Sequence, residues 1–196
     1  MKKITSVLFL FYCFSVGWAQ IVPPCTLEIT DAETFARDWT VIDVNSNVSA
    51  NTWTYNDGNA MYTQDKSNAA DDWLIAPAVT LEAGKAYKVS AYVMHDGMSF
   101  DKQKIELKIG TAPTVEGLTT RLVYDESFQS RLFVEKSGTF SPAESGVFYV
   151  GLHCSSGSYM GDLYFQKIVI EEAPVYPAQI TDLSIVAGER GALSAT

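Results

Sequence analysis

Oxygen-bearing side chains stand at every second position of one short stretch, at Asp43, Asn45 and Asn47. Calcium takes roughly six to eight oxygen ligands, and alternate residues of a loop can point toward one ion. These three residues are therefore predicted calcium ligands. The stretch is not an EF-hand loop, because Val48 and Thr54 stand where that loop needs its glycine and its bidentate glutamate. The alternative interpretation is an Asx-turn between two strands.

Two acids, Asp71 and Asp72, directly precede an apolar run that begins at Trp73. Adjacent residues of a strand point to opposite faces, so the two acids are not expected to share one ion. Asp72 is the predicted fourth ligand of the calcium site. Alternatively, one of the two carboxylates binds backbone N–H groups of a neighbouring loop and seats the strand.

Aromatic residues make up 12% of the chain, and their faces can stack on sugar rings. Tyr92, Tyr124 and Tyr159 fall on or near polar strand faces or loops, so they are the predicted ligand-binding residues. Tyr55 and the tryptophans could also form a stacking platform, but their positions inside strands predict core packing. The tryptophans concerned are Trp39, Trp53 and Trp73.

The cysteine count is compatible with an oxidising compartment. Cys13 lies in the N-terminal segment, and Cys25 and Cys154 remain. An even number of cysteines predicts a Cys25–Cys154 disulfide, which would tie the N-terminal region to a late strand. Two free, buried thiols are the alternative.

The sequence gives little support for catalysis. His153 directly precedes Cys154, so in a strand its imidazole would point away from the thiol. No Gly-x-Ser-x-Gly, His-Glu-x-x-His, Cys-x-x-Cys or P-loop motif is present. We therefore expect no catalytic residues. A glycoside hydrolase needs only two carboxylates, so a carboxylate-based hydrolase stays open as a less favoured alternative.

Period-two alternation of apolar and polar residues predicts the strands that must position these side chains. In residues 87–93, for example, Tyr87, Val89 and Ala91 alternate with Lys88 and Ser90. Further strands are predicted at residues 40–44, 52–55, 105–109, 122–124, 132–134, 147–152 and 163–170, with one short helix at 31–38.

Many short strands separated by Gly-containing turns are typical of an all-β fold, and the length favours a two-sheet jelly-roll sandwich. Within it, residues 71–93 are expected to form a hairpin. Trp73, Ile75 and Val79 should then lie on the core side of its first strand, and Pro77 suggests an edge or a bulge there.

The first 19 residues have the features of a secretory signal peptide. Lys2 and Lys3 precede an apolar run, and small residues surround a cleavage point after Ala19. No later segment reaches the roughly 18 apolar residues of a transmembrane helix. Removing the two lysines takes the net charge from −9 to −11. An acidic chain without a basic cluster is not expected to bind nucleic acid.

Changes in composition predict the remaining domain boundaries. Residues 20–172 should form the jelly-roll domain, ending in Glu171 and Glu172, and residues 173–179 a proline-containing linker. Residues 180–196 contain two further strand-like patterns, which cannot form a stable domain alone. Neighbouring C-terminal domains could therefore be missing from this chain.

Three stretches together resemble a known family: WTVIDVNSNVSANTWTY, DDWLIAPAVTLEAGKAYKVSAYV and DLYFQKIVIEE. They are similar to the choice-of-anchor J or cleaved-adhesin domain, a MAM-like jelly roll of exported Gram-negative proteins. The resemblance covers residues 25–172, and the middle stretch is the most specific. The tail PAQITDLSIVAGERGALSAT resembles the first two strands of a fibronectin type III domain.

The resemblance implies a non-catalytic module, secreted or displayed on the surface of a Gram-negative bacterium, that binds an extracellular glycan or protein. Related domains often carry acidic loops suited to calcium near residues 43–47, and here two of those acids are asparagines. Less negative charge lowers calcium affinity. A structural spacer that positions neighbouring domains is the main alternative function.

Overall fold

The computed structural model describes residues 20–45, 51–98 and 100–174. The predicted signal peptide, Asn47 and the predicted fibronectin-like segment lie outside the described residues. In chain order the elements are β1 (Cys25–Glu28), α1 (Ala32–Asp38), β2 (Thr40–Asp43), β3 (Trp53–Asn56), β4 (Asn59–Tyr62), β5 (Asp72–Ile75), β6 (Val79–Leu81), β7 (Tyr87–His95), β8 (Gln103–Gly110), β9 (Thr120–Phe128), β10 (Val134–Phe140), β11 (Gly146–Cys154) and β12 (Leu163–Glu172).

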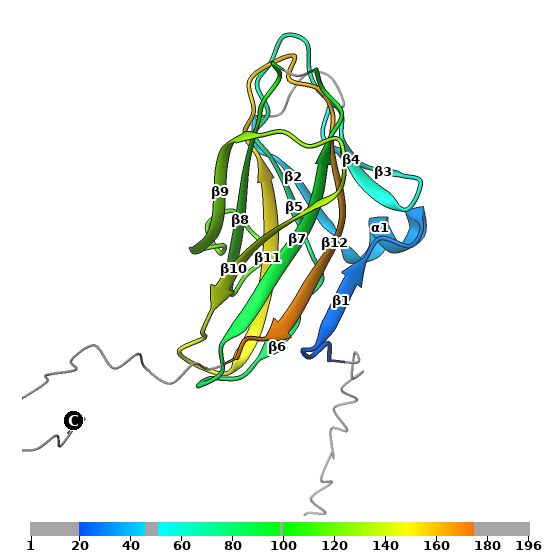
Figure 1. The fold of residues 1–196 in the computed structure, drawn as a ribbon. Helices are drawn as coiled ribbons and strands as arrows, with labels where there is room; N and C mark the ends of the chain where they lie inside the picture. Colours follow the sequence, from blue (N-terminus) through cyan, green and yellow to red (C-terminus); the bar gives the residue numbers. More distant parts are fainter. Residues whose placement is uncertain (1–19, 46–50, 99, 175–196) are drawn as a thin grey trace, which may run out of the picture.

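The strands form two antiparallel sheets packed face to face, as the sequence predicts (Figure 1). One sheet has the order β10-β7-β12-β4-β3, with β1 also pairing with β12. The other has the order β2-β5-β11-β8-β9, with β6 also pairing with β11. Within the described part of the chain, no helix is both long and apolar enough to cross a membrane.

The predicted helix is present because its sequence caps both ends. The Asp31 carboxylate accepts a hydrogen bond from the backbone N–H of Thr34 at 2.7 Å, which satisfies a donor of the first turn. Glu33 in the first turn and Arg37 in the last turn complement the helix dipole. Trp39 then adopts extended backbone angles and leads directly into β2.

The main core lies between the two sheets and contains most of the buried apolar side chains. Trp39 packs edge-on against Phe165, and Trp53 packs in the same way against Tyr62. Tyr55 packs against the same cluster while remaining partly exposed. The expected core role of these aromatic residues is confirmed.

The hairpin expected at residues 71–93 is wrong, because β5 and β6 belong to one sheet and β7 belongs to the other. The placement of Val79 in the main core is confirmed, but that of Trp73 and Ile75 on the inner face is wrong. Leu74 faces the main core, whereas Trp73 and Ile75 form a separate buried cluster with Leu118 on the outer side. The β8–β9 loop carries Leu118 over that side, so the loop buries residues that would otherwise face water.

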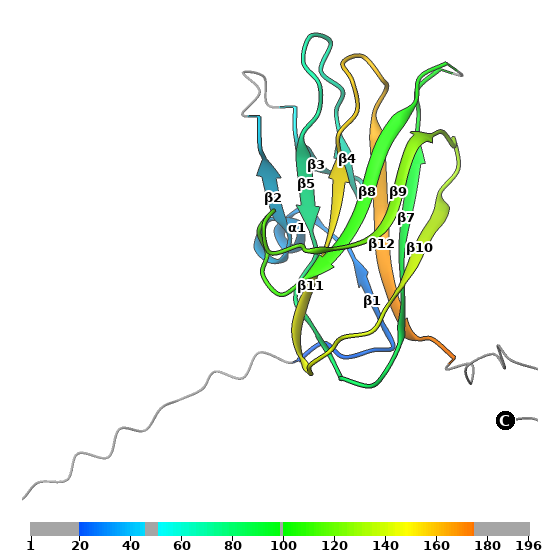
Figure 2. The ribbon, with the colours of Figure 1, turned by 90° about the vertical axis from the view of Figure 1, so that its left-hand side faces the viewer.

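The two ends of the sandwich hold different parts of the chain. The chain enters and leaves the described domain at the end near β6, as Figure 1 shows. The β4–β5, β7–β8 and β11–β12 loops gather at the opposite end. In Figure 2 the sheet β2-β5-β11-β8-β9 faces the viewer, and the β8–β9 loop lies over its lower part.

Candidate functional site

A row of side chains crosses the outer face of the second sheet. Strand register places Trp73 beside His153, His153 beside Glu106, and Glu106 beside Tyr124, one residue from each of four strands. Alternate residues of a strand share a face, so all four point away from the main core. We call Trp73, His153, Glu106 and Tyr124 the transverse row.

The inner half of the transverse row is closely packed. The rings of Trp73 and His153 are stacked, with centroids 4.2 Å apart and planes 6° apart. Nε2 of His153 lies 2.8 Å from Oδ1 of Asp71, and its Nδ1 lies 3.6 Å from Oε2 of Glu106. The imidazole is therefore held between two carboxylates and an indole, in a fixed orientation.

Two cations neutralise the buried carboxylate in the row. Glu106 is almost fully buried and forms an ion pair with the Arg121 guanidinium, while Nζ of Lys108 lies 3.5 Å from its second oxygen. The same cations lie over aromatic rings: Lys108 over Trp73 at 5.4 Å, and Arg121 over Tyr124 at 4.7 Å. Tyr124 remains 47% exposed, so the accessible half of the row combines an aromatic ring with a guanidinium.

The three tyrosines predicted as ligand-binding residues do not form one site. Tyr124 belongs to the transverse row. Tyr92 lies on the outer face of the other sheet, where Nζ of Lys167 is 5.1 Å from its ring centroid. Tyr159 is exposed in the β11–β12 loop and has a left-handed backbone, with φ of 60°.

The predicted calcium ligands Asp43 and Asp72 lie directly opposite each other on β2 and β5. Asp72 is fully buried, and its pKa is raised to about 6. Burial is the main cause, and the neighbouring carboxylates of Asp43 and Asp71 add to it. Oδ1 of each aspartate is buried without a hydrogen-bond partner, and the buried hydroxyl of Thr52 lies beside Asp72. Opposed, unpartnered carboxylate oxygens fit a cation, because otherwise two like charges face each other out of water.

The remainder of the predicted calcium site is less complete. The Asn45 amide donates to the carbonyl oxygen of Ala69 at 2.7 Å, and Asn47 lies outside the described residues. Among residues 20–45, 51–98 and 100–174, no group of three or more His, Cys, Asp or Glu side chains could hold a metal. Any cation bound by Asp43 and Asp72 would need hydroxyl, amide, carbonyl or water oxygens as well.

The expectation that Asp71 and Asp72 point to opposite faces is confirmed. Asp71 contacts His153 on the outer face, whereas Asp72 lies inside and accepts a hydrogen bond from the backbone N–H of Asp71. The two acids therefore serve different parts of the molecule.

The predicted Cys25–Cys154 disulfide is wrong, because both thiols are free. Cys25 lies on β1 in one sheet, and Cys154 lies at the far end of β11 in the other. Cys154 is fully buried beside Gln103 and Ser156, and burial raises its pKa to about 12. Its thiol is therefore a poor nucleophile, and the neighbouring His153 faces the opposite side of the sheet.

Comparison with known proteins places this geometry in context. Residues 32–156, more than half of the chain, match a family described as "Carbohydrate binding domain". No curated protein sequence is significantly similar to the chain.

Solved structures share the fold. The K3 cleaved adhesin domain of Lys-gingipain from Porphyromonas gingivalis W83 has a TM-score of 0.56 and 11% identity, covering 74% of this chain and 98% of that one. The K1 domain of the same protein has a TM-score of 0.53 and 14% identity, covering 76% and 99%. A CBM4 structure has a TM-score of 0.51 and 15% identity, covering 76% and 94%. The sequence resemblance to cleaved-adhesin domains thus has a structural counterpart, while the choice-of-anchor J and fibronectin assignments stay predictions.

Proposed function

Because the chain belongs to the carbohydrate-binding domain family, we propose that it is an exported, non-catalytic module that binds a glycan on the transverse row. The observation that carries this proposal is the alignment of His153, Glu106 and Tyr124 across adjacent strands, flanked by Arg121 and Lys108. Aromatic faces pack against the apolar side of a sugar ring, while charged and amide groups bond its hydroxyls.

The open part of the row sets the size of the ligand. Trp73 is covered by the β8–β9 loop and His153, so its ring is not available for stacking. From His153 to Tyr124 the row spans two interstrand spacings, roughly 10 Å. This length suits a short glycan segment lying across the strands, with Tyr124 as its stacking partner and Arg121 as its principal donor.

A glycan array tests the proposal, using residues 20–174 with three matched variants. Tyr124→Ala and Arg121→Gln should each weaken binding of the best glycan at least tenfold. Tyr92→Ala is the control, because it removes the same ring from the other sheet and should leave binding unchanged. Failure of the wild-type chain to bind any glycan, or equal loss with Tyr92→Ala, would contradict the proposal. If the wild-type chain bound a protein and no glycan, the result would instead favour a protein adhesin.

We also propose that calcium is a structural ligand of Asp43 and Asp72. The support is the pair of buried, unpartnered oxygens and the raised pKa of Asp72. A bound cation would fix the end of β2 against β5 and would supply no chemistry to the glycan site. Asn45 is a further candidate ligand through its amide oxygen.

A further inference from the structure

A pocket of about 550 Å³ lies between two loops at the end of the sandwich opposite to the chain ends. Its lining residues are Gly97, Met98, Phe100, Gln129, Ser130 and Arg131. The volume falls within the range of roughly 300–1,000 Å³ that is usual for small-molecule sites. This rim pocket, as we call it, is formed by loops, whereas the transverse row lies on a sheet face.

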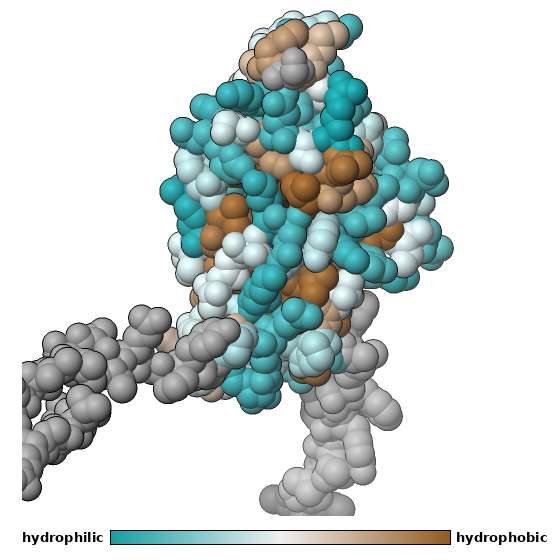
Figure 3. Space-filling view, viewed as in Figure 1, coloured by the Kyte–Doolittle hydropathy of each residue, from teal (hydrophilic) through white to brown (hydrophobic). Residues whose placement is uncertain are grey.

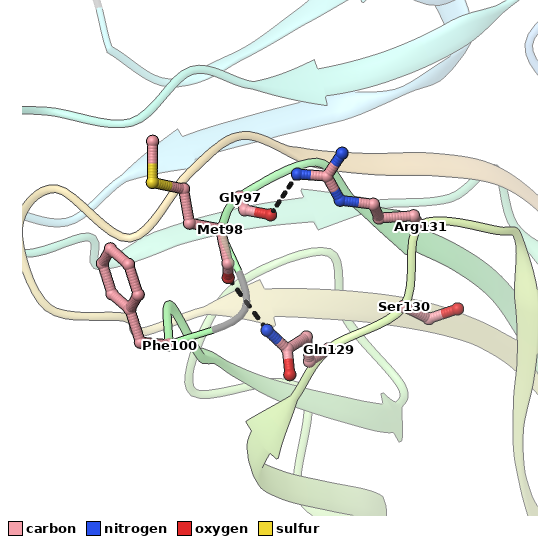
Figure 4. Close-up of a pocket in the computed structure, with 6 residues that line it drawn as sticks. All are labelled: Gly97, Met98, Phe100, Gln129, Ser130 and Arg131. Carbon is pink, nitrogen blue, oxygen red and sulfur yellow. Dashed lines mark hydrogen bonds between the residues drawn. The ribbon is translucent and has the colours of Figure 1, made fainter.

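The rim pocket has one apolar wall and one polar wall. Figure 4 shows Met98 and Phe100 on one side and Gln129, Ser130 and Arg131 on the other. Met98 and Phe100 are 61% and 73% exposed, and Figure 3 shows apolar surface at this end of a mostly hydrophilic face. Large apolar side chains gathered in water beside polar donors mark interaction sites.

Hydrogen bonds hold the walls in position without a ligand. Gln129 Nε2 donates to the Met98 carbonyl oxygen at 2.9 Å, and Arg131 Nη2 donates to the Gly97 carbonyl oxygen at 3.0 Å. The backbone N–H of His95 also donates to the carbonyl oxygen of Ser130 at 2.7 Å. Gly97 packs on the buried His95 ring so closely that a β-carbon would not fit. The pocket is therefore preformed, which lowers the entropy lost on binding.

The charge of the lining favours an anionic ligand. Arg131 is the charged residue among the six that line the pocket, and none of the six is a carboxylate. Two carboxylates lie behind the lining and accept backbone hydrogen bonds: Asp101 accepts from the Met98 N–H, and Asp96 accepts from the Asp162 N–H. Arg131 commits one donor to Gly97, and a guanidinium has further donors in a fork that matches a carboxylate.

We propose that the rim pocket is a second site that binds a terminal sugar residue carrying a carboxylate, such as a uronic acid. Phe100 stacks on the ring, Arg131 pairs with the carboxylate, and Gln129 bonds a hydroxyl through its amide oxygen. The ligand class rests on the proposed function, but the location is independent of the transverse row.

Calorimetric titration with two trisaccharides tests this proposal, one ending in glucuronic acid and the other in glucose. The pair differs only in the carboxylate. Wild-type residues 20–174 should bind the acidic trisaccharide at least tenfold more tightly. Arg131→Gln should remove this preference, and Phe100→Ala should weaken both ligands. Arg37→Gln, which removes an exposed positive charge from α1, is the control and should change neither affinity.

The outcomes separate this site from the transverse row. Tyr124→Ala should leave the acidic trisaccharide bound, and its loss in that variant would overturn the proposal by placing the ligand on the sheet face. Equal wild-type affinity for both trisaccharides, no binding of either, or an unchanged preference in Arg131→Gln would also overturn it. A glycan-array hit that depends on Tyr124 would still support the proposed function in each of these cases.

Discussion

At the scale of single residues, the buried acid Asp72 has the clearest consequence for stability. Its pKa is raised to about 6 by burial, so between about pH 4 and 6 the folded chain binds a proton that the unfolded chain has lost. Stability therefore falls as pH rises through this window. In EDTA, Asp72→Asn should lack this decline and exceed wild type at pH 7.5 by roughly 2–3 kcal/mol. Denaturant melts at several pH values measure the difference between the two curves.

Calcium distinguishes a cation site from a plain buried acid. Excess calcium should stabilise wild type by about 2.7 kcal/mol at a hundred times its Kd, and it should stabilise Asp72→Asn far less. An equal response of both proteins to calcium would show that any ion binds elsewhere. Parallel pH curves in EDTA would contradict the raised pKa.

The free thiols allow a second test at this scale. In residues 20–196, Ellman's reagent should detect two thiols after denaturation and fewer in the native protein. Cys154 should be unreactive until the chain unfolds, because it is fully buried and its pKa is about 12. If no thiol were detected in denaturant without reductant, the predicted Cys25–Cys154 disulfide would be supported after all.

At the scale of elements, the alternation of apolar and polar residues predicted those strands that depend on neighbouring residues of the chain. Alternation at residues 87–93 and 163–170 identified β7 and β12, because alternation depends on neighbouring residues of the chain. The pattern missed β4, whose four residues Asn59–Tyr62 lack clean alternation. It misplaced Trp73, because an apolar residue beneath a loop looks the same in sequence as one between two sheets.

The transverse row shows why the site was only partly predictable. Tyr124 was found because an aromatic residue on a polar strand face is a local signal. His153 and Glu106 carry no motif, and their meeting depends on the register of β11 with β8. Alternation does place Glu106 and Lys108 on one face of a strand, which is the available signal, but it does not identify the neighbouring strand.

A single substitution can test whether the β8–β9 loop packs on the outer face of the sheet. Leu118 is buried against Trp73 and Ile75, and Gly151 leaves space for it where a β-carbon would collide. Leu118→Ala should destabilise the fold by roughly 2–5 kcal/mol and shift tryptophan emission to the red. Leu132→Ala is the matched control, since this exposed leucine should change stability by less than about 0.5 kcal/mol. Unchanged emission and stability in Leu118→Ala would mean that the loop does not cover the sheet.

At the scale of the whole molecule, β12 decides where the domain can end. It pairs with β7, β4 and β1, and so lies inside its sheet, not at an edge. Its side chains Leu163, Phe165, Ile168 and Ile170 are all fully buried in the main core. Of the two described residues after Glu172, Ala173 donates its backbone N–H to the carbonyl oxygen of Ala86 at 2.7 Å. The sandwich therefore needs β12 complete.

Chains shortened at the C-terminus test whether β12 is required for folding. Residues 20–174 should unfold in one cooperative transition, with the same midpoint in urea as residues 20–196. Residues 20–162 should fail to fold, because removing β12 exposes the inner faces of β7 and β1 and leaves their backbone groups unpaired. Circular dichroism and urea melts of the three chains measure both expectations. A lower midpoint for residues 20–174 would show that the C-terminal segment packs on the sandwich, and would move the domain boundary beyond the predicted linker.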